Sequence, residues 1–301
     1  NPSFVRSASF TDQEKQSLYG PGVFYCKDAF EGLGSVEKLV DPNARADYVR
    51  ERHQDVIEGV AKRAALQEKA KAMHAHRTTS GPSRDVAIPK PPFFGTRHIE
   101  ALPIEELFRY IDRNTLYRLH WGAKNAKGEQ WEQLVRDEFE PRLQQYFDET
   151  RSTDWLRPAA VYGYFPAAAD GEALVVYDPE DENREIARFD FPRQDIRDLL
   201  CLSDYFREAG TGKRDVVAFQ VVTVGDALLT KGEGMMKGGD DSEGYYLHGY
   251  GVRLAEAAAE VVNRRIREEL GIGSERGLRY SWGYPACPDH TQHHILFDLL
   301  P

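Results

Sequence analysis

The sequence predicts an α+β fold: a twisted, mainly antiparallel sheet with flanking helices, preceded by a connecting helix and by the remnant of an α/β domain. Three observations support this prediction. From Phe93 onward, short β-branched and aromatic runs interleave with helical patterns, and the Asp170-Gly171 pair is typical of a hairpin turn. A long, highly polar helical pattern precedes this region. Before that pattern lie only one apolar run and one amphipathic pattern.

Residues 1–41 are interpreted as the end of a preceding α/β domain. The apolar run from Gly22 to Cys26 follows a Gly-Pro pair and predicts a buried strand. Apolar residues then recur at helical spacing from Ala29 to Val40. A strand and a helix alone do not close a core, so we expect this remnant to dock on this chain or on a part outside it.

Residues 42–92 are expected to connect this remnant to the next domain. Asp41 can accept hydrogen bonds from free amides, and Pro42 suits the first position of a helix. From residue 44 to about residue 75 the composition is mostly Ala, Glu, Lys, Arg and Gln, which predicts a solvated connecting helix with one shallow contact face. Residues 78–92 are rich in Pro, Gly and Ser, so we expect a linker there.

Residues 93–301 are expected to form the main domain. The predicted elements are helices over 103–118, 130–146 and 245–270, and strands over 159–165, 173–177 and 216–224. Gly271 or Gly273 is expected to cap the last helix. Residues 198–206 are ambiguous between helix and strand, and the chain contains no internal repeats.

Composition excludes several classes of protein. The chain has 301 residues, of which 41% are hydrophobic and 11% aromatic, so most of it should fold. It has no signal-peptide pattern and no apolar run near the ~20 residues that span a bilayer, so no membrane association is expected. A net charge of −10 argues against a general nucleic-acid binder. The three distant cysteines, Cys26, Cys201 and Cys287, indicate no disulfide framework and favour a reducing cytoplasm.

Three glycine-rich segments lack the features of a phosphate-binding loop. Residues 271–277 follow a helix and are predicted to be a helix cap and turn. Residues 232–239 contain no Gly-Lys-Ser/Thr, so a flexible loop is expected. Residues 163–166 are interpreted as a strand end before a turn.

The spacing of Cys287, His290, His293 and His294 is of a kind that zinc sites use. The sequence contains no CxxC, HExxH or second cluster that would supply the remaining ligands, so no metal site is predicted. Neither a Ser-His-Asp nor a Cys-His nucleophile has a local signature here, and no catalytic residue is predicted.

Residues 276–290 carry the most informative pattern. Arg279 can hold a carboxylate through two parallel N–H groups. Gly283 permits close approach of the backbone, and Trp282 and Tyr284 can present ring faces to a cation. Two prolines hold the loop without helix or sheet hydrogen bonds. The pattern suits a small extended ligand with a carboxylate and a positive centre; the alternative is a proline-pinned loop that packs its aromatic side chains.

The residues from Arg279 to Pro288, Arg-x-x-x-Gly-Tyr-Pro-Ala-Cys-Pro, resemble the S-adenosylmethionine (AdoMet) signature of the C-terminal activation domain of cobalamin-dependent methionine synthase. Two further stretches match in the same order. Residues 93–95 and 110–112, Phe-Phe-Gly and Tyr-Ile-Asp, resemble the start of that domain, and residues 253–260 resemble its long helix. Residues 21–33 are similar to the last strand and helix of the preceding cobalamin-binding domain. The resemblance covers nearly the whole chain.

The resemblance implies roles for particular residues. AdoMet carries a sulfonium, an ammonium and a carboxylate; Arg279 would pair with the carboxylate, and Asp112 and Glu256 would favour the cationic groups. The remaining implied binding residues are Gly283, Tyr284, Pro285 and Ala286, beside the ligand. Judged without the resemblance, Asp112 is a polar residue within a predicted helix, and Glu256 lies on a helix face within reach of Arg253.

The resemblance also implies a function. The chain would be part of a cobalamin-dependent 5-methyltetrahydrofolate–homocysteine methyltransferase, the enzyme that makes methionine. It would bind AdoMet and support reductive remethylation of cob(II)alamin to methylcobalamin. The implied partners are the cobalamin-binding domain of the same protein and flavodoxin or another reductant. The alternative is a non-enzymatic module that binds AdoMet or docks a partner.

The sequence departs from the family pattern in places. It lacks the zinc- and homocysteine-binding domain, the folate domain and the cobalamin-ligating Asp-x-His-x-x-Gly motif, so cobalamin would be bound mainly by an upstream domain. It stops at Pro301, before the family's C-terminal aromatic segment, so we expect a truncated C-terminal end. The loop at residues 271–274 is shorter, and an acidic residue before Arg279 is missing.

Overall fold

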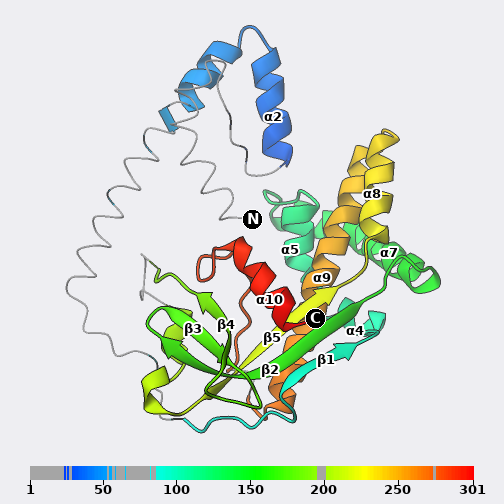
Figure 1. The fold of residues 1–301 in the computed structure, drawn as a ribbon. Helices are drawn as coiled ribbons and strands as arrows, with labels where there is room; N and C mark the ends of the chain where they lie inside the picture. Colours follow the sequence, from blue (N-terminus) through cyan, green and yellow to red (C-terminus); the bar gives the residue numbers. More distant parts are fainter. Residues whose placement is uncertain are drawn as a thin grey trace.

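The computed structural model describes residues 29–52, 86–194, 201–273 and 276–301, together with positions 24, 26, 54, 55, 58, 65 and 82. The predicted strand at 22–26 lies outside the described residues except for two positions, as does most of the predicted helix over 44–75. The main domain combines a curled antiparallel sheet with flanking helices, so the predicted α+β class is confirmed (Figure 1).

The N-terminal helix α2 spans Ala29–Val40, as predicted. Asp41 accepts a hydrogen bond of 2.9 Å from the backbone N–H of Asn43, and helix begins again at residue 45. The buried Tyr48 hydroxyl donates to Ser35 Oγ at 2.6 Å. The two helices are therefore joined by a buried polar contact as well as by chain continuity.

The five-stranded sheet is built around one long central strand, β2 (Ala159–Asp170). Strand β5 (Asp215–Thr223) pairs along one edge of β2 from Ala159 to Ala167. Strands β1 (Gly95–Ile99) and β3 (Ala173–Tyr177) share its other edge, one after the other. Strand β4 (Glu185–Asp190) pairs with β3. All pairings are antiparallel, and the turn at Asp170-Gly171 is a hairpin as predicted.

Among its described residues, the main domain also contains six α helices longer than one turn. They are α4 (Ile104–Arg109), α6 (Gly128–Leu134), α7 (Glu140–Ser152), α8 (Ala227–Lys237), α9 (Asp241–Glu269) and α10 (His293–Leu299). Shorter turns are α5 (Arg113–Thr115), the π-helical turns Leu116–His120 and Val135–Phe139, and the 3-10 turns Leu202–Tyr205, Ala209–Thr211 and His290–Gln292. No helix among the described residues is both long and apolar enough to cross a membrane.

The sheet separates two hydrophobic cores because side chains alternate between the faces of a strand. On one face, Tyr162 and Tyr164 of β2 pack with residues of α4, α7 and α9. On the other face, Phe189 of β4 and Phe219 of β5 pack with the loop that contains Cys287 and with α10. The second core therefore positions the loop that carries the predicted ligand-binding signature.

Four predicted elements differ from the structure. The expected helix over 103–118 breaks at residues 110–112, where Asp112 caps a new turn. The expected helix over 130–146 extends from Gly128 to Ser152 through a π-helical turn. The expected flexible loop at 232–239 is mostly the helix α8. Gly163 lies in the middle of β2, not at a strand end.

Gly232 of α8 and Gly244 of α9 explain why this glycine-rich segment forms a helix. A Cβ on Gly232 would lie 3.0 Å from the carbonyl oxygen of Gly244 in α9, and a Cβ on Gly244 would collide with the carbonyl oxygen of Gly232. These residues therefore let two helix backbones approach closely. Their cost in helix propensity is offset by packing between α8 and α9.

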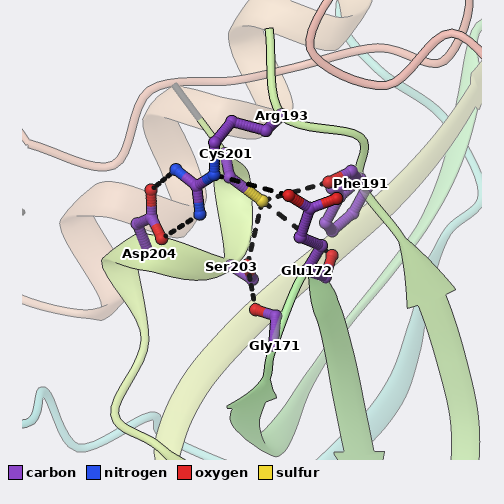
Figure 2. A network of polar contacts seen from close by, with 7 residues as sticks. All are labelled: Gly171, Glu172, Phe191, Arg193, Cys201, Ser203 and Asp204. Atoms are coloured by element: carbon purple, nitrogen blue, oxygen red, sulfur yellow. Dashed lines mark hydrogen bonds and ion pairs between the residues drawn. The ribbon is translucent and has the colours of Figure 1, made fainter. Parts of the chain in front are cut away.

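A polar network fixes the β2–β3 turn to the segment after β4 (Figure 2). Arg193 donates two hydrogen bonds, of 2.5 and 2.8 Å, to the carboxylate of Asp204 and lies 3.4 Å from that of Glu172. Ser203 Oγ donates to the carbonyl of Gly171 at 2.8 Å, and the buried Cys201 thiol donates to that of Phe191 at 3.0 Å. Leu202–Tyr205 form a short 3-10 turn, so the described part of the ambiguous segment 198–206 is neither α-helix nor strand; residues 198–200 lie outside the described residues.

Candidate functional site

Helix α9 is the scaffold of the candidate site. It begins at the cap Asp240, which accepts a hydrogen bond of 3.3 Å from the backbone N–H of Glu243, and Gly271 follows its end with φ of +63°. Of the two glycines predicted to end this helix, Gly271 and Gly273, it is Gly271 that directly follows the C-cap Leu270 with a positive φ. Glu256 and Glu260 are one turn apart on this helix, so they share a face.

Arg279 lies against this face of α9. Its Nη2 donates to Glu256 Oε2 at 2.9 Å, and its Nη1 donates to Ser281 Oγ at 3.0 Å. Its Nε lies 3.7 Å from Glu260 Oε2. The Arg279 side chain is only 22% exposed, so the surrounding protein restrains the guanidinium. The structure thus brings together two of the residues that the resemblance implied, Glu256 and Arg279.

A pocket of about 340 Å³ adjoins this ion pair. Its polar lining consists of Glu256, Arg279 and Ser281. Its remaining lining comes from the end of β5, from α8 and from α9: Val222, Val224, Gly225, Leu228, Leu229, Gly251, Val252, Ala255 and Ala259. An apolar cavity with a few convergent polar groups is the usual form of a small-molecule site.

The loop after Arg279 is a compact turn. Gly283 adopts φ of +94° and its N–H donates to the carbonyl of Cys287 at 2.8 Å, while the N–H of Cys287 donates to the carbonyl of Tyr284 at 3.0 Å. Tyr284 and Pro285 are exposed, and Ala286 is buried. The exposed residues at the tip are held by backbone hydrogen bonds, so the loop presents a fixed surface.

Trp282 and Tyr284 differ in their surroundings. The Trp282 ring packs in the second core, 5.3 Å from the ring of Phe189 and 6.3 Å from that of Phe219, centroid to centroid. The Trp282 ring therefore packs in the core, as the alternative interpretation of the loop expected, and does not present its face to a cation. The Tyr284 side chain, in contrast, lies on the surface of the loop and is 49% exposed.

Asp112 lies on a different element from the other predicted residues. It is exposed and caps α5, accepting a hydrogen bond of 3.0 Å from the Thr115 N–H and another from the Thr115 hydroxyl. These hydrogen bonds, together with the positive charge of Arg253, lower the pKa of Asp112. Asp112 therefore remains an anion at neutral pH. The charge interaction with Arg253 of α9 shows that Asp112 lies near this helix, and Glu256 follows Arg253 by about one turn.

The π-helical turn after Asp112 packs on the same helix. A Cβ on Gly249 would lie 2.7 Å from the Cβ of His120, and Trp121 Nε1 donates to the carbonyl of Tyr246 at 3.0 Å. Burial, followed by the charges of Arg253 and His248, lowers the pKa of His120. Gly249 thus allows the segment that follows Asp112 to pack closely against α9.

The predicted residues are only partly brought together. Glu256 and Arg279 are in contact and line the pocket. Asp112 and residues 283–286 are not among the residues that line it. Sequence reasoning missed Ser281 and Glu260 as neighbours of Arg279. Glu260 had a signal, because its spacing of four residues from Glu256 places both on one helix face, whereas Ser281 had none.

Cys287 and His293, two of the four residues with zinc-like spacing near the C-terminus, contact other parts of the chain. Cys287 is buried, its thiol donates to the carbonyl of Ser281 at 2.9 Å, and burial raises its pKa to about 11. The ring of His293 stacks on that of Phe297 with centroids 5.9 Å apart, and the ring of His290 lies tilted against it at 5.5 Å. Within the described ranges, no group of three or more His, Cys, Asp or Glu side chains could hold a metal ion.

Residues 103–301 match the family described as vitamin B12 dependent methionine synthase, activation domain. The chain belongs to this family. Methionine synthase of Mycobacterium tuberculosis is 31% identical to it over 334 aligned positions, which cover 97% of this chain and 28% of that protein. Methionine synthase of Mycobacterium leprae is also 31% identical, over 342 positions, with the same coverage. The chain therefore spans about 28% of the length of these relatives.

A solved structure is also similar to this activation-domain chain. The crystal structure of the MetH reactivation domain bound to AdoHcy (S-adenosylhomocysteine) matches it with a TM-score of 0.59 and 26% sequence identity. The match covers 71% of this chain and 72% of the solved chain. The family expected from the loop at 279–288 is thus confirmed by the family match and by this fold similarity.

Proposed function

We propose that this chain binds AdoMet and thereby supports reductive remethylation of cobalamin in a cobalamin-dependent methionine synthase. The observation that carries the proposal is the Glu256–Arg279 ion pair at the edge of an otherwise apolar pocket. An acidic and a basic side chain side by side form a template for the amino-acid end of AdoMet, which carries an ammonium and a carboxylate on adjacent positions.

The donor set fits this ligand. Arg279 supplies a guanidinium for the carboxylate, and Glu256 and the anionic Asp112 supply negative charge for the ammonium and sulfonium. The apolar lining from β5, α8 and α9 suits the uncharged part of the ligand. AdoHcy, bound in the similar solved structure, shares the amino-acid and adenosyl groups with AdoMet. Gly283, Tyr284, Pro285 and Ala286 are proposed to border the ligand.

Cobalamin is proposed to be bound by another domain of the full-length protein. The family is named for it, but the sequence holds no Asp-x-His-x-x-Gly motif. We therefore assign cobalamin to another domain of the full-length protein and derive no step on it. The part proposed for this chain is to bind AdoMet and orient its methyl group, which requires no general acid or base. Electron supply by flavodoxin or an equivalent reductant, and transfer of methyl groups to homocysteine by the whole enzyme, complete the proposal.

The division of the chain is part of the same proposal. Residues 1–41 would be the tail of the cobalamin-binding domain, 42–92 a connecting helix and linker, and 93–301 the AdoMet-binding domain. Residues 87–92 form neither helix nor strand, and the first strand begins at Gly95, which supports a boundary near residue 92. Free thiols at Cys26, Cys201 and Cys287 are consistent with a reducing, cytoplasmic location.

Titration calorimetry with AdoMet tests the proposal. The expected result is saturable binding that Arg279→Ala weakens about 10- to 100-fold, the range for a hydrogen bond to a charged group. Arg188→Ala, which removes an exposed arginine of β4 that pairs with Glu185 and Asp170, is the matched control and should leave the affinity unchanged. No binding at millimolar AdoMet, or equal affinity for wild type and Arg279→Ala, would contradict the proposal. If the chain binds AdoMet but does not stimulate cobalamin remethylation when the cobalamin domain and a reductant are present, it is a non-enzymatic AdoMet-binding module.

A further inference from the structure

Arg279 has more anionic neighbours than a ligand carboxylate site needs. Glu256 accepts a hydrogen bond from its Nη2 at 2.9 Å, and Glu260 lies 3.7 Å from its Nε. Glu260 also accepts a hydrogen bond of 3.4 Å from Nη2 of Arg267, about two turns further along α9. Charges of opposite sign therefore alternate along this face, with Arg279 inserted from the loop between the two glutamates.

The two glutamates stand in different positions toward a ligand. Glu256 lines the pocket, whereas Glu260 does not. Under the proposed function, Glu256 must turn from Arg279 toward the ligand ammonium, so Arg279 loses its nearest anion at that moment. Glu260 remains, because it is held by Arg267 as well and lies away from the pocket.

The Nε of Arg279 decides which edge of the guanidinium is open. Nε is buried and has no hydrogen-bond partner within the part of the chain that the structure describes, and Glu260 Oε2 lies 3.7 Å from it. A ligand in the pocket cannot reach a buried atom, so the ligand carboxylate must approach the Nη1 and Nη2 end. Ser281 already holds Nη1 on the loop side at 3.0 Å. Glu260 and Ser281 together therefore define the orientation of the open end.

We infer that Glu260 is a positioning residue, which holds Arg279 from behind so that its Nη end meets the ligand carboxylate, and that the site selects ligands with a free carboxylate. This inference rests on the proposed function. Glu260 thus orients Arg279 toward a carboxylate without contacting the ligand, whereas Glu256 contacts the ligand itself.

The test compares two ligands on one variant. Glu260→Gln keeps the shape of the side chain and removes its charge; AdoMet carries the carboxylate and decarboxylated AdoMet does not. In titration calorimetry the variant should bind AdoMet about two- to fivefold more weakly, the range for a partly exposed ion pair, and bind decarboxylated AdoMet as wild type does. Glu268→Gln, on the same helix and paired with Arg264 at 2.8 Å, is the matched control and should change neither affinity.

The outcomes separate the alternatives. An equal loss for both ligands would show a structural role and overturn the inference, as would unchanged or tighter binding of AdoMet by Glu260→Gln. Failure of the wild-type chain to bind either ligand would instead overturn the proposed function and this inference with it. Glu260→Asp keeps the charge but retracts it by one methylene, so it should show the same selectivity with a smaller loss, which covers the case in which the glutamine variant folds poorly.

Discussion

Replacing Gly163 by alanine would place a methyl group where strands β1 and β2 meet. A Cβ at this position would collide with the carbonyl oxygen of Gly95 and lie 3.1 Å from Phe165 Cε2. Gly163 is paired with Thr96 on one side and with Phe219 on the other, so the backbone cannot move aside without disturbing both pairings.

The magnitude follows from two opposing effects. Overpacking a fixed backbone costs about 1–3 kcal/mol. Removing a glycine from a strand recovers about 0.5–1 kcal/mol of conformational entropy. We expect Gly163→Ala to lower the free energy of unfolding by about 1–2 kcal/mol, which for a domain of this size lowers the Tm by roughly 2–8 °C.

Gly234→Ala is the matched control. Gly234 lies inside α8, and a Cβ there would meet nothing within 4 Å. The same substitution should therefore raise the free energy of unfolding by about 0.5–1 kcal/mol and raise the Tm. Thermal unfolding followed by circular dichroism measures both. An unchanged or higher Tm for Gly163→Ala, or a lower Tm for Gly234→Ala, would refute the packing described for β2 and α8.

Three further outcomes are expected. Asp112→Asn should keep the cap of α5 and the stability but weaken AdoMet binding, whereas Asp112→Ala should also lose about 1 kcal/mol of stability; equal affinity for Asp112→Asn and wild type in calorimetry would remove Asp112 from the site. Burial raises the pKa of Glu269, but hydrogen bonds from Arg265, Tyr162 and Tyr164 outweigh this and lower the pKa below its ordinary value of 4.5. A carboxyl whose pKa is lower in the folded than in the unfolded state stabilises the fold above its unfolded pKa, and this stabilisation is lost as the pH falls through the folded pKa. The difference in free energy of unfolding between wild type and Glu269→Gln, measured by urea titration, should therefore be constant above about pH 5 and shrink below pH 4.5. A difference independent of pH would contradict this assignment. Cys287, with its pKa raised to about 11, should resist iodoacetamide at pH 8 until the chain is unfolded in urea, and rapid native alkylation seen by mass spectrometry would show that the loop opens.

The sequence predicted those elements whose pattern is local. Strand β5 is almost entirely β-branched or aromatic, and the structure places it at Asp215–Thr223. The turn at Asp170-Gly171 and the end of α9 at Gly271 each need a positive φ that glycine supplies, and both were predicted. The loop from Arg279 onward carries the resemblance that implied the family, and the family is confirmed by the match over residues 103–301.

The missed elements depend on contacts between distant residues. Strand β1 is a short edge strand with Thr96, Arg97 and His98 in its middle, which gives no apolar alternation. Helix α8 contains Gly232 at the point where its backbone packs closely against Gly244 of α9, and only the partner helix makes a glycine favourable there. The placement of Ser281 and Glu260 around Arg279 depends in the same way on how the loop lies across α9.

A crystal structure of this chain soaked with AdoMet tests the central claim most directly. The account predicts ligand density in the pocket beside Glu256, with the carboxylate on the Nη end of Arg279 and the ammonium on Glu256, and with Glu260 still beside Nε. Ligand bound at another place, or bound in the pocket with its carboxylate away from Arg279, would contradict it.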